Sequence, residues 1–113
     1  MSVVYFVRDP QAASVWYAKH LFSDAPIQEE SGSFWLDAEG IEVGFHPSDE
    51  KNSAGGGVVV YWKVKNFRQT RDAMLRDGCE AWRGPLVISE NRVICQLRDS
   101  FGNIVGLEGR TER

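Results

Sequence analysis

Two pairs of charged side chains have the residue types and spacing that metal binding or acid–base catalysis requires. Glu42 and His46 lie four residues apart in an alternating segment, so both side chains face the same side of one strand. Lys63 and Glu108 fall in two later segments of the same kind. Carboxylate and imidazole groups bind divalent metal ions, and a carboxylate can act as a general base. We therefore consider a metal site formed by His46, Glu42 and Glu108. The competing interpretation is that His46, which precedes a proline, ends its strand in solvent.

Aromatic side chains offer a second kind of chemistry, the stacking of a flat ligand. The chain has four tryptophans among 113 residues. Periodicity predicts that Trp16 and Trp62 belong to the core. The other aromatic candidates, Tyr61, Trp35 and Trp82, combine a large apolar face with a hydrogen-bond donor, which suits a binding surface.

Two further polar residues have both a functional and a structural interpretation. Lys63 could bind an anionic group of a ligand, or it could pair with Glu42 or Glu108. His20 falls on the apolar stripe of a helix, so we expect it to pack there rather than to act in catalysis.

Composition argues against several classes of function. A net charge of −3 and a pI of about 5.3 speak against a nucleic-acid surface, which is usually basic. No stretch reaches the roughly 20 apolar residues of a membrane helix, and residues 1–7 lack the basic leader of a secretory signal. We therefore expect a cytoplasmic protein of bacterial type. Cys79 and Cys95 have no metal-ligand spacing and are expected to be reduced, and the glycines at 55–57 lack the lysine of a phosphate loop.

The elements that must position these groups are strands and helices in a repeated order. Residues 2–8 are β-rich, and Asp9 followed by Pro10 is typical of a helix start. The helix carries an apolar stripe at helical spacing, formed by Ala13, Trp16, Tyr17, His20 and Leu21. Two strands follow at 33–37 and 41–46, joined by a turn at residues 38–40.

The same order begins again after a polar segment. Residues 47–57 are predicted to be a flexible linker because they are rich in small and polar residues. Asn66 is the expected N-cap of a second helix, and Gly78 its C-terminal cap. The other predicted elements are strands at 58–65, 79–83, 92–98 and 104–108, a turn at 99–103 and a frayed tail at 109–113. The two halves align at an offset of 57, so we predict a single domain, 1–113, with module one at 1–46, the linker at 47–57 and module two at 58–113.

Alternation along the strands separates an apolar face from a mixed face. Every second residue is apolar in four strands, and these sets should pack beneath the helices; they are Val3, Tyr5 and Val7, then Ile41, Val43 and Phe45, then Val58, Val60, Trp62 and Val64, and finally Val105 and Leu107. The opposite faces mix aromatic, small and charged residues. That mixture predicts a concave, partly apolar wall of the kind that binds small molecules.

These features together resemble the vicinal oxygen chelate superfamily, whose members include glyoxalase I, bleomycin-resistance proteins and extradiol dioxygenases. The resemblance rests on the paired strand–helix–strands units, on the opening at residues 3–9 and, most specifically, on the Asp-x-x-Gly-Asn turn at 99–103 before the last strand. It spans nearly the whole chain. It implies an α+β fold in which two βαβββ modules form an open curled sheet around a central cup.

The metal enzymes of that superfamily hold their ion with His or Gln, Glu, His and Glu on the inner faces of four strands. The resemblance places those positions at Ser2, Glu42, Val59 and Gly106. Only Glu42 has a side chain of the metal-binding type, whereas a catalytic ion needs about three protein ligands. The resemblance thus implies the fold, but no metal and no cofactor.

We therefore predict a metal-free, small-molecule-binding protein of the glyoxalase/bleomycin-resistance type, holding an aromatic or amphipathic ligand in the cup. The predicted ligand-binding residues are Phe6, Trp35, Glu42, Tyr61, Lys63, Trp82, Arg98 and Glu108. One alternative is a glyoxalase-like lyase or isomerase, or a dioxygenase-like enzyme, with Glu42 or Glu108 as base or with a shifted metal site. Another is a dimer whose cup is vestigial. We expect a homodimer that interacts with neither nucleic acid nor membrane.

Overall fold

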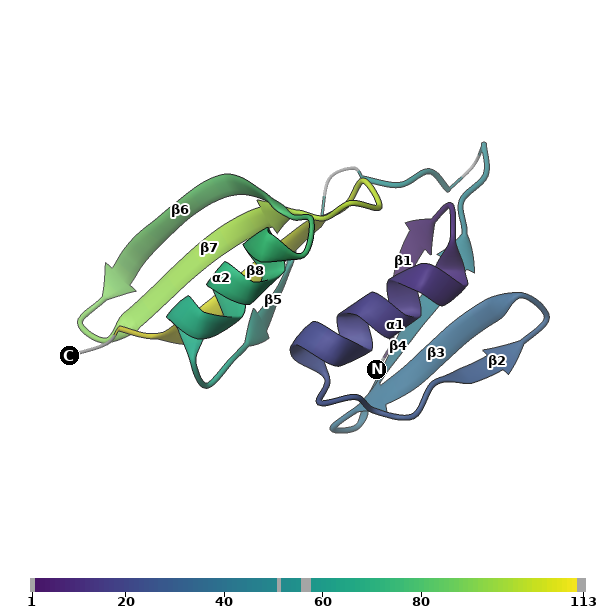
Figure 1. Cartoon of the computed structure of the whole chain (residues 1–113), viewed down its shortest axis with the longest axis horizontal. Helices are drawn as coiled ribbons and strands as arrows, with labels where there is room; N and C mark the ends of the chain where they lie inside the picture. The colour runs from purple at the N-terminus through teal and green to yellow at the C-terminus, as the bar shows by residue number, and fades with distance from the viewer. Residues whose placement is uncertain (1, 51, 56–57, 112–113) are drawn as a thin grey trace. The chain divides into compact units, whose positions relative to one another are not determined.

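The computed structural model describes residues 2–50, 52–55 and 58–111. The chain divides into two compact units, Met1–Gly56 and Gly57–Arg113, each built from one helix and one four-stranded sheet (Figure 1). The first contains β1 (Ser2–Val7), α1 (Pro10–Leu21), β2 (Gln28–Glu30), β3 (Ser33–Ala38) and β4 (Ile41–Pro47). The second contains β5 (Val60–Lys63), α2 (Phe67–Arg76), β6 (Glu80–Ser89), β7 (Arg92–Arg98) and β8 (Ile104–Arg110). The predicted α+β class and the βαβββ order of each half are confirmed.

The two sheets have the same topology. The strand orders are β1-β4-β3-β2 and β5-β8-β7-β6, with the first two strands of each parallel and the others antiparallel. The parallel pairs are equivalent in the two sheets, since Val3 pairs with Val43 and Val60 pairs with Val105. The offset of 57 takes Val3 to Val60 but not Val43 to Val105, so the repeat does not run without gaps to the last strand. In each unit the helix crosses one face of its sheet and leaves the other face open (Figure 1). We call these uncovered surfaces the open faces.

The apolar faces form the two cores, as alternation predicts. In the first unit, Tyr5, Tyr17 and Phe45 make an aromatic cluster with ring centroids 5.0 to 5.7 Å apart. In the second unit, Met74, Leu97, Val105 and Leu107 are fully buried. The assignment of two tryptophans to the core needs correction, because Trp16 and Trp62 are only half-buried.

Local signals fix most element ends. The carboxylate of Asp9 accepts a hydrogen bond from the Ala12 N–H (3.1 Å), which caps α1 as predicted. Asn66 stands at the start of α2 but makes no capping hydrogen bond with its side chain. The 99–103 turn is also confirmed: the buried Asp99 carboxylate accepts hydrogen bonds from the N–H groups of Phe101 (2.9 Å) and Asn103 (2.8 Å).

Several predicted boundaries are wrong. β2 was missed because it has only three residues, all exposed, and therefore no apolar alternation. β5 is shorter than 58–65, and Val58 is 78% exposed before it. β6 continues past 83 to Ser89, and Gly109 and Arg110 belong to β8 rather than to a frayed tail.

The start of the segment predicted as a linker is ordered. Pro47 ends β4, and the Ser48 N–H donates to the Val7 carbonyl (2.8 Å). A turn follows, in which the Asn52 N–H donates to the Asp49 carboxylate (2.7 Å). Residues 51, 56 and 57 lie outside the described residues, so the rest of the linker stays a prediction. The cup between the two modules also stays a prediction. The helices of the described part are too short to cross a membrane.

Candidate ligand-binding faces

The open face of the first unit brings together three of the predicted site residues. Glu42 on β4 lies opposite Ser2 on β1 and opposite Asp37 on β3. Two residues farther along β4, Gly44 lies opposite Trp35 of β3. Two residues beyond that, His46 lies opposite Phe6 of β1. The residues between them point the other way: Tyr5 and Phe45, for example, pack against Tyr17 of α1. The side chains of Glu42, Trp35 and Phe6 therefore share the side of the sheet that α1 does not cover.

A hollow of about 550 Å³ lies at one end of this face, lined by Ser2, Trp35, Asp37, Gly40 and Glu42. Asp37 and Glu42 are direct cross-strand partners, so their Cα atoms are about 5 Å apart. The Asp37 carboxylate also accepts a hydrogen bond from the Gly40 N–H (3.0 Å). Two neighbouring carboxylates beside an indole make the hollow negative and partly aromatic. Asp37 was not among the predicted site residues, and the β3–β4 register now places it beside Glu42.

His46 does not end its strand in solvent. It is half-buried, and its ring meets Phe6 edge-on with centroids 6.1 Å apart. A Cβ added to Gly44 would lie 3.3 Å from His46 Nε2, so the imidazole lies over the glycine. Within either unit, the described residues contain no group of three His, Cys, Asp or Glu side chains that could hold a metal ion.

The open face of the second unit carries the other five predicted site residues. Lys63 lies opposite Glu108, and the Arg92 guanidinium forms an ion pair with the Glu108 carboxylate (2.9 Å). Arg98 lies over the Trp82 ring, with Cζ 5.7 Å from its centroid. Gln96 Nε2 donates to the Tyr61 hydroxyl (2.7 Å). Arg92 and Gln96 were missed because only the β7–β8 register shows which residues they reach.

Gly106 leaves room on this face for the ring of Tyr61. A Cβ at this position would lie 2.5 Å from Cδ1 of Tyr61, so the phenol ring covers the glycine. Gly106 is one of the positions to which the family resemblance assigns a metal ligand. The volume that a ligand side chain would need there is filled by the ring of Tyr61. Val59, another such position, precedes β5 and has no donor side chain.

Neither cysteine has the features of a nucleophile. Both are buried and free. Burial raises the pKa of the Cys79 thiol to about 12, and the negative charges of Asp99 and Asp77 add to this effect. Burial also raises the pKa of Cys95, although the positive charge and hydrogen bond of Arg71 oppose the shift. Both thiols therefore stay protonated near neutral pH.

Several solved structures with the same architecture are of glyoxalase-related or resistance proteins. A glyoxalase/bleomycin resistance protein from Albidiferax ferrireducens T118 superposes with a TM-score of 0.75 at 17% identity, covering 97% of each chain. A glyoxalase/bleomycin resistance protein/dioxygenase family enzyme from Burkholderia phytofirmans PsJN gives a TM-score of 0.78 at 15% identity, also covering 97% of each chain. The fosfomycin resistance protein FosX from Mesorhizobium loti gives 0.72 at 16% identity, covering 98% of this chain and 91% of that one.

Sequence comparison adds no closer relative. No protein-family model matches the chain, and no curated protein matches it. At these identities the structural similarity establishes the fold alone.

Proposed function

We propose, from the premise that this chain has the vicinal oxygen chelate superfamily fold, that it binds a small aromatic or amphipathic molecule without the help of a metal ion. The hollow on the open face of the first unit carries this proposal. Trp35 offers an aromatic surface there, and Asp37 and Glu42 offer two carboxylates at its side. An aromatic ligand with a positively charged group matches that lining.

The second open face supports binding rather than catalysis. Three of its charged groups already have partners, since Glu108 pairs with Arg92 and Arg98 lies over the Trp82 ring. The Glu108 carboxylate also accepts a hydrogen bond from Arg92 Nε (3.1 Å), so the guanidinium occupies the side on which it approaches. Trp82 and Tyr61 nevertheless remain 50% and 37% exposed, so the face offers aromatic surface to a ligand.

The donor set does not fit the metal that the fold family implies. Of the four positions given by the resemblance, Ser2 has a hydroxyl, Val59 an alkyl group and Gly106 no side chain at all. The Tyr61 ring occupies the space above Gly106. The shifted set of His46, Glu42 and Glu108 would draw on a carboxylate that already pairs with Arg92. The residues at these positions therefore do not fit a catalytic metal ion.

A series of naphthalene compounds tests the proposal on the full chain. 1-Naphthylmethylammonium, 1-naphthamide and 1-naphthoate share one ring system and differ in the charge of the head group. We expect the ammonium compound to bind roughly tenfold more tightly than the amide, because charge-assisted hydrogen bonds to a carboxylate are the stronger ones. Isothermal titration calorimetry gives the affinities, and the NMR signal of the Trp35 indole N–H locates the site.

Matched variants separate the hollow from general charge effects. Asp37→Asn and Glu42→Gln should each weaken binding of the ammonium compound several-fold. Glu39→Gln removes the same charge from the neighbouring exposed turn, outside the hollow, and should leave the affinity unchanged. Equal affinity for all three compounds, or an unperturbed Trp35 signal, would refute the proposal. Loss of binding in a chelator such as EDTA would refute its metal-free part.

A further inference from the structure

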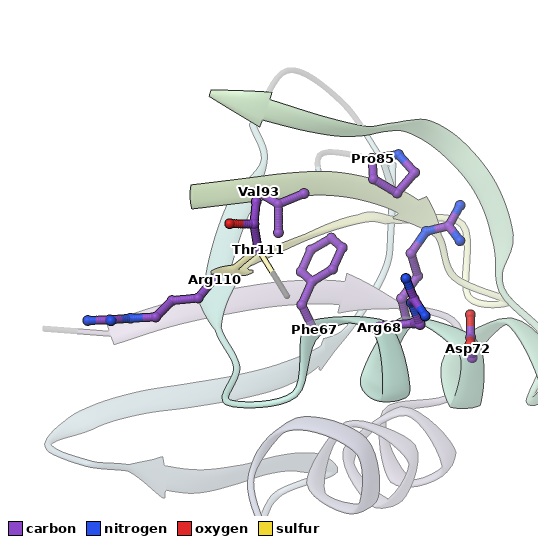
Figure 2. A pocket seen from close by; sticks show the side chains of 8 residues that line it. Phe67, Arg68, Asp72, Pro85, Val93, Arg110 and Thr111 are labelled. Carbon is purple, nitrogen blue, oxygen red and sulfur yellow. The ribbon is translucent and has the colours of Figure 1, made fainter. Parts of the chain in front are cut away.

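A second cavity lies on the helix-covered side of the second unit, away from its open face. It has a volume of about 430 Å³ and lies between the first turns of α2, the strands β6 and β7, and the end of β8 (Figure 2). All of its lining residues belong to this one unit. This volume falls within the range of small-molecule sites. We call this cavity the arginine crevice.

Three arginines and one carboxylate line the arginine crevice. Arg68, Arg71 and Asp72 come from α2, and Arg110 comes from β8. Figure 2 shows the Arg110 side chain extending away from the other labelled side chains, so it contributes charge at the rim. The lining therefore carries an excess of positive charge in a protein whose net charge is −3. An excess of this kind favours an anion.

Two buried polar atoms of the described residues lack hydrogen-bond partners, and both belong to residues that line this crevice. They are Nε of Arg71, a donor, and Oγ1 of Thr111, which can donate or accept. Buried groups of this kind are rarely left unsatisfied in native proteins, and an unexplained pair in one cavity indicates a missing partner. A guanidinium and a hydroxyl are both groups that donate hydrogen bonds to an oxyanion.

The remaining wall is apolar. The Phe67 ring stands up from the start of α2 toward Val93 on β7, and Pro85 of β6 closes the far side (Figure 2). Phe67 and Val93 are 6% and 7% exposed, so they belong to the core as well as to the wall. A ligand that covered this wall would need an apolar body next to its charged group.

We propose that the arginine crevice binds a small oxyanion that carries an apolar, preferably aromatic, group. The carboxylate or phosphate would lie against Arg71 and Thr111, with Arg68 beside it, and the apolar group would lie against Phe67 and Val93. This site is separate from the hollow around Trp35. It would therefore select the opposite charge from the ligand of the proposed function.

The anionic member of the naphthalene series is the probe. We expect 1-naphthoate to bind the full chain at least about tenfold more tightly than 1-naphthamide, since each hydrogen bond to a charged group is a strong one. Its affinity should fall as salt is added. In NMR titrations the Val93 and Thr111 methyl signals should shift, while the Trp35 indole signal should not.

Variants of three arginines on α2 compare charges that line the crevice with one that does not. Arg71→Met keeps an unbranched side chain and removes the charge, so the affinity for 1-naphthoate should drop about tenfold. Arg68→Gln should lower it by a smaller factor. Arg76→Gln removes a charge from the exposed end of α2, outside the crevice, and should have no effect.

Three results would overturn the proposal. The first is equal affinity for naphthoate and naphthamide. The second is an equal loss of affinity in Arg76→Gln and Arg71→Met. The third is a set of shifts that maps to Trp35 instead of Val93 and Thr111. If Arg71→Met fails to fold by circular dichroism, Arg68→Gln and the mapping on the unaltered chain still decide the question. Failure here leaves the ammonium titration of the first unit unaffected, so the two proposals can fail separately.

Discussion

At the scale of single residues, two glycines on the open faces, Gly44 and Gly106, differ in how much space they leave for a side chain. The Tyr61 ring covers Gly106, and the first atom that an added Cβ would meet is ring carbon Cδ1 at 2.5 Å. Above Gly44 the nearest atom is His46 Nε2, the far end of a side chain, at 3.3 Å. The ring cannot give way without losing the hydrogen bond between Tyr61 and Gln96.

Gly106→Ala should therefore destabilise the protein by about 1–3 kcal/mol, the usual cost of overpacking. Gly44→Ala should cost much less, because the imidazole can rotate away. Urea unfolding of both variants measures the difference. Adding Tyr61→Ala to Gly106→Ala should recover most of the loss, and equal losses with and without the tyrosine would show that the ring is not the cause.

The Cys79 thiol makes stability depend on pH on the alkaline side. Its pKa is raised to about 12 by burial, whereas an unfolded cysteine titrates near about 8.5. Below the pKa of the unfolded state, the thiol is protonated in both the folded and the unfolded state, so it does not make the free energy of unfolding depend on pH. Above it the unfolded state loses its proton first, so the free energy of unfolding falls as the pH rises.

We expect this fall to be on the order of 1 kcal/mol per pH unit between about pH 9 and pH 10.5, measured by urea unfolding at several pH values. Cys79→Ala should have a shallower profile, even if it is less stable at neutral pH. Parallel profiles for the two proteins would contradict the assignment to Cys79.

The sequence predicted which face of a strand a residue lies on, because that depends only on the alternation along the strand itself. Alternation placed Phe6 and Glu42 on one face, and the register confirms it. The face of Trp35 was left open, and the β3–β4 register now places it beside Glu42. The contacts between side chains could not be predicted, because they depend on which strand lies next to which. Gln96 reaches Tyr61 across 35 residues of sequence, and no local pattern encodes that distance.

At the scale of elements, the two helices begin with equivalent residues that act differently. Asp9 caps α1 through the Ala12 N–H, whereas Asn66 makes no such bond at the start of α2. Asp9→Ala should therefore cost about 1 kcal/mol of unfolding free energy. Asn66→Ala should change it by less than about 0.5 kcal/mol. Chemical denaturation measures both, and a larger loss at 66 than at 9 would contradict the capping geometry.

The strand β6 shows why an element boundary was wrong. The predicted strand ended at residue 83, and the next residues, Gly84 and Pro85, are of types that usually interrupt a strand. In the sheet order β5-β8-β7-β6 this strand is at the edge, where a proline need not donate to a neighbour. The β6–β7 pairing accommodates the two residues with a register shift between Arg83 and Leu86. Edge position is a property of the sheet, so the local sequence could not reveal it.

At the scale of the whole molecule, the duplication was visible in the sequence and the binding chemistry was not. The offset of 57 predicted two units, and their strand orders match. The arginine crevice was not predicted, because its residues come from α2, β6, β7, β8 and the residue after β8, and they share no sequence pattern. The two units thus repeat their backbone topology while their polar side chains differ.

Ligand binding should be visible in the stability of the whole chain. A ligand that binds only the folded state stabilises it by about 2.7 kcal/mol at 100 times its dissociation constant. Both charged naphthalene compounds should therefore raise the Tm, and 1-naphthamide should raise it less. Trp35→Ala should lower the Tm shift with the ammonium compound alone. Arg71→Met should roughly halve the shift with naphthoate alone, because a tenfold loss of affinity lowers the stabilisation from about 2.7 to about 1.4 kcal/mol. Loss of both shifts in either variant would mean that the substitution damaged the fold.

The edge strand β6 also bears on how this protein avoids aggregation. Leu86, Val87 and Ile88 are 57%, 61% and 42% exposed on a strand whose outer backbone has no neighbour in its sheet. Such an edge can template the addition of further chains and the growth of fibrils. Pro85 directly precedes this run, and a proline without an amide hydrogen is a known gatekeeper against such growth. Pro85, which lies just beyond the predicted strand end at residue 83, thus stands beside the exposed edge at the position of such a gatekeeper.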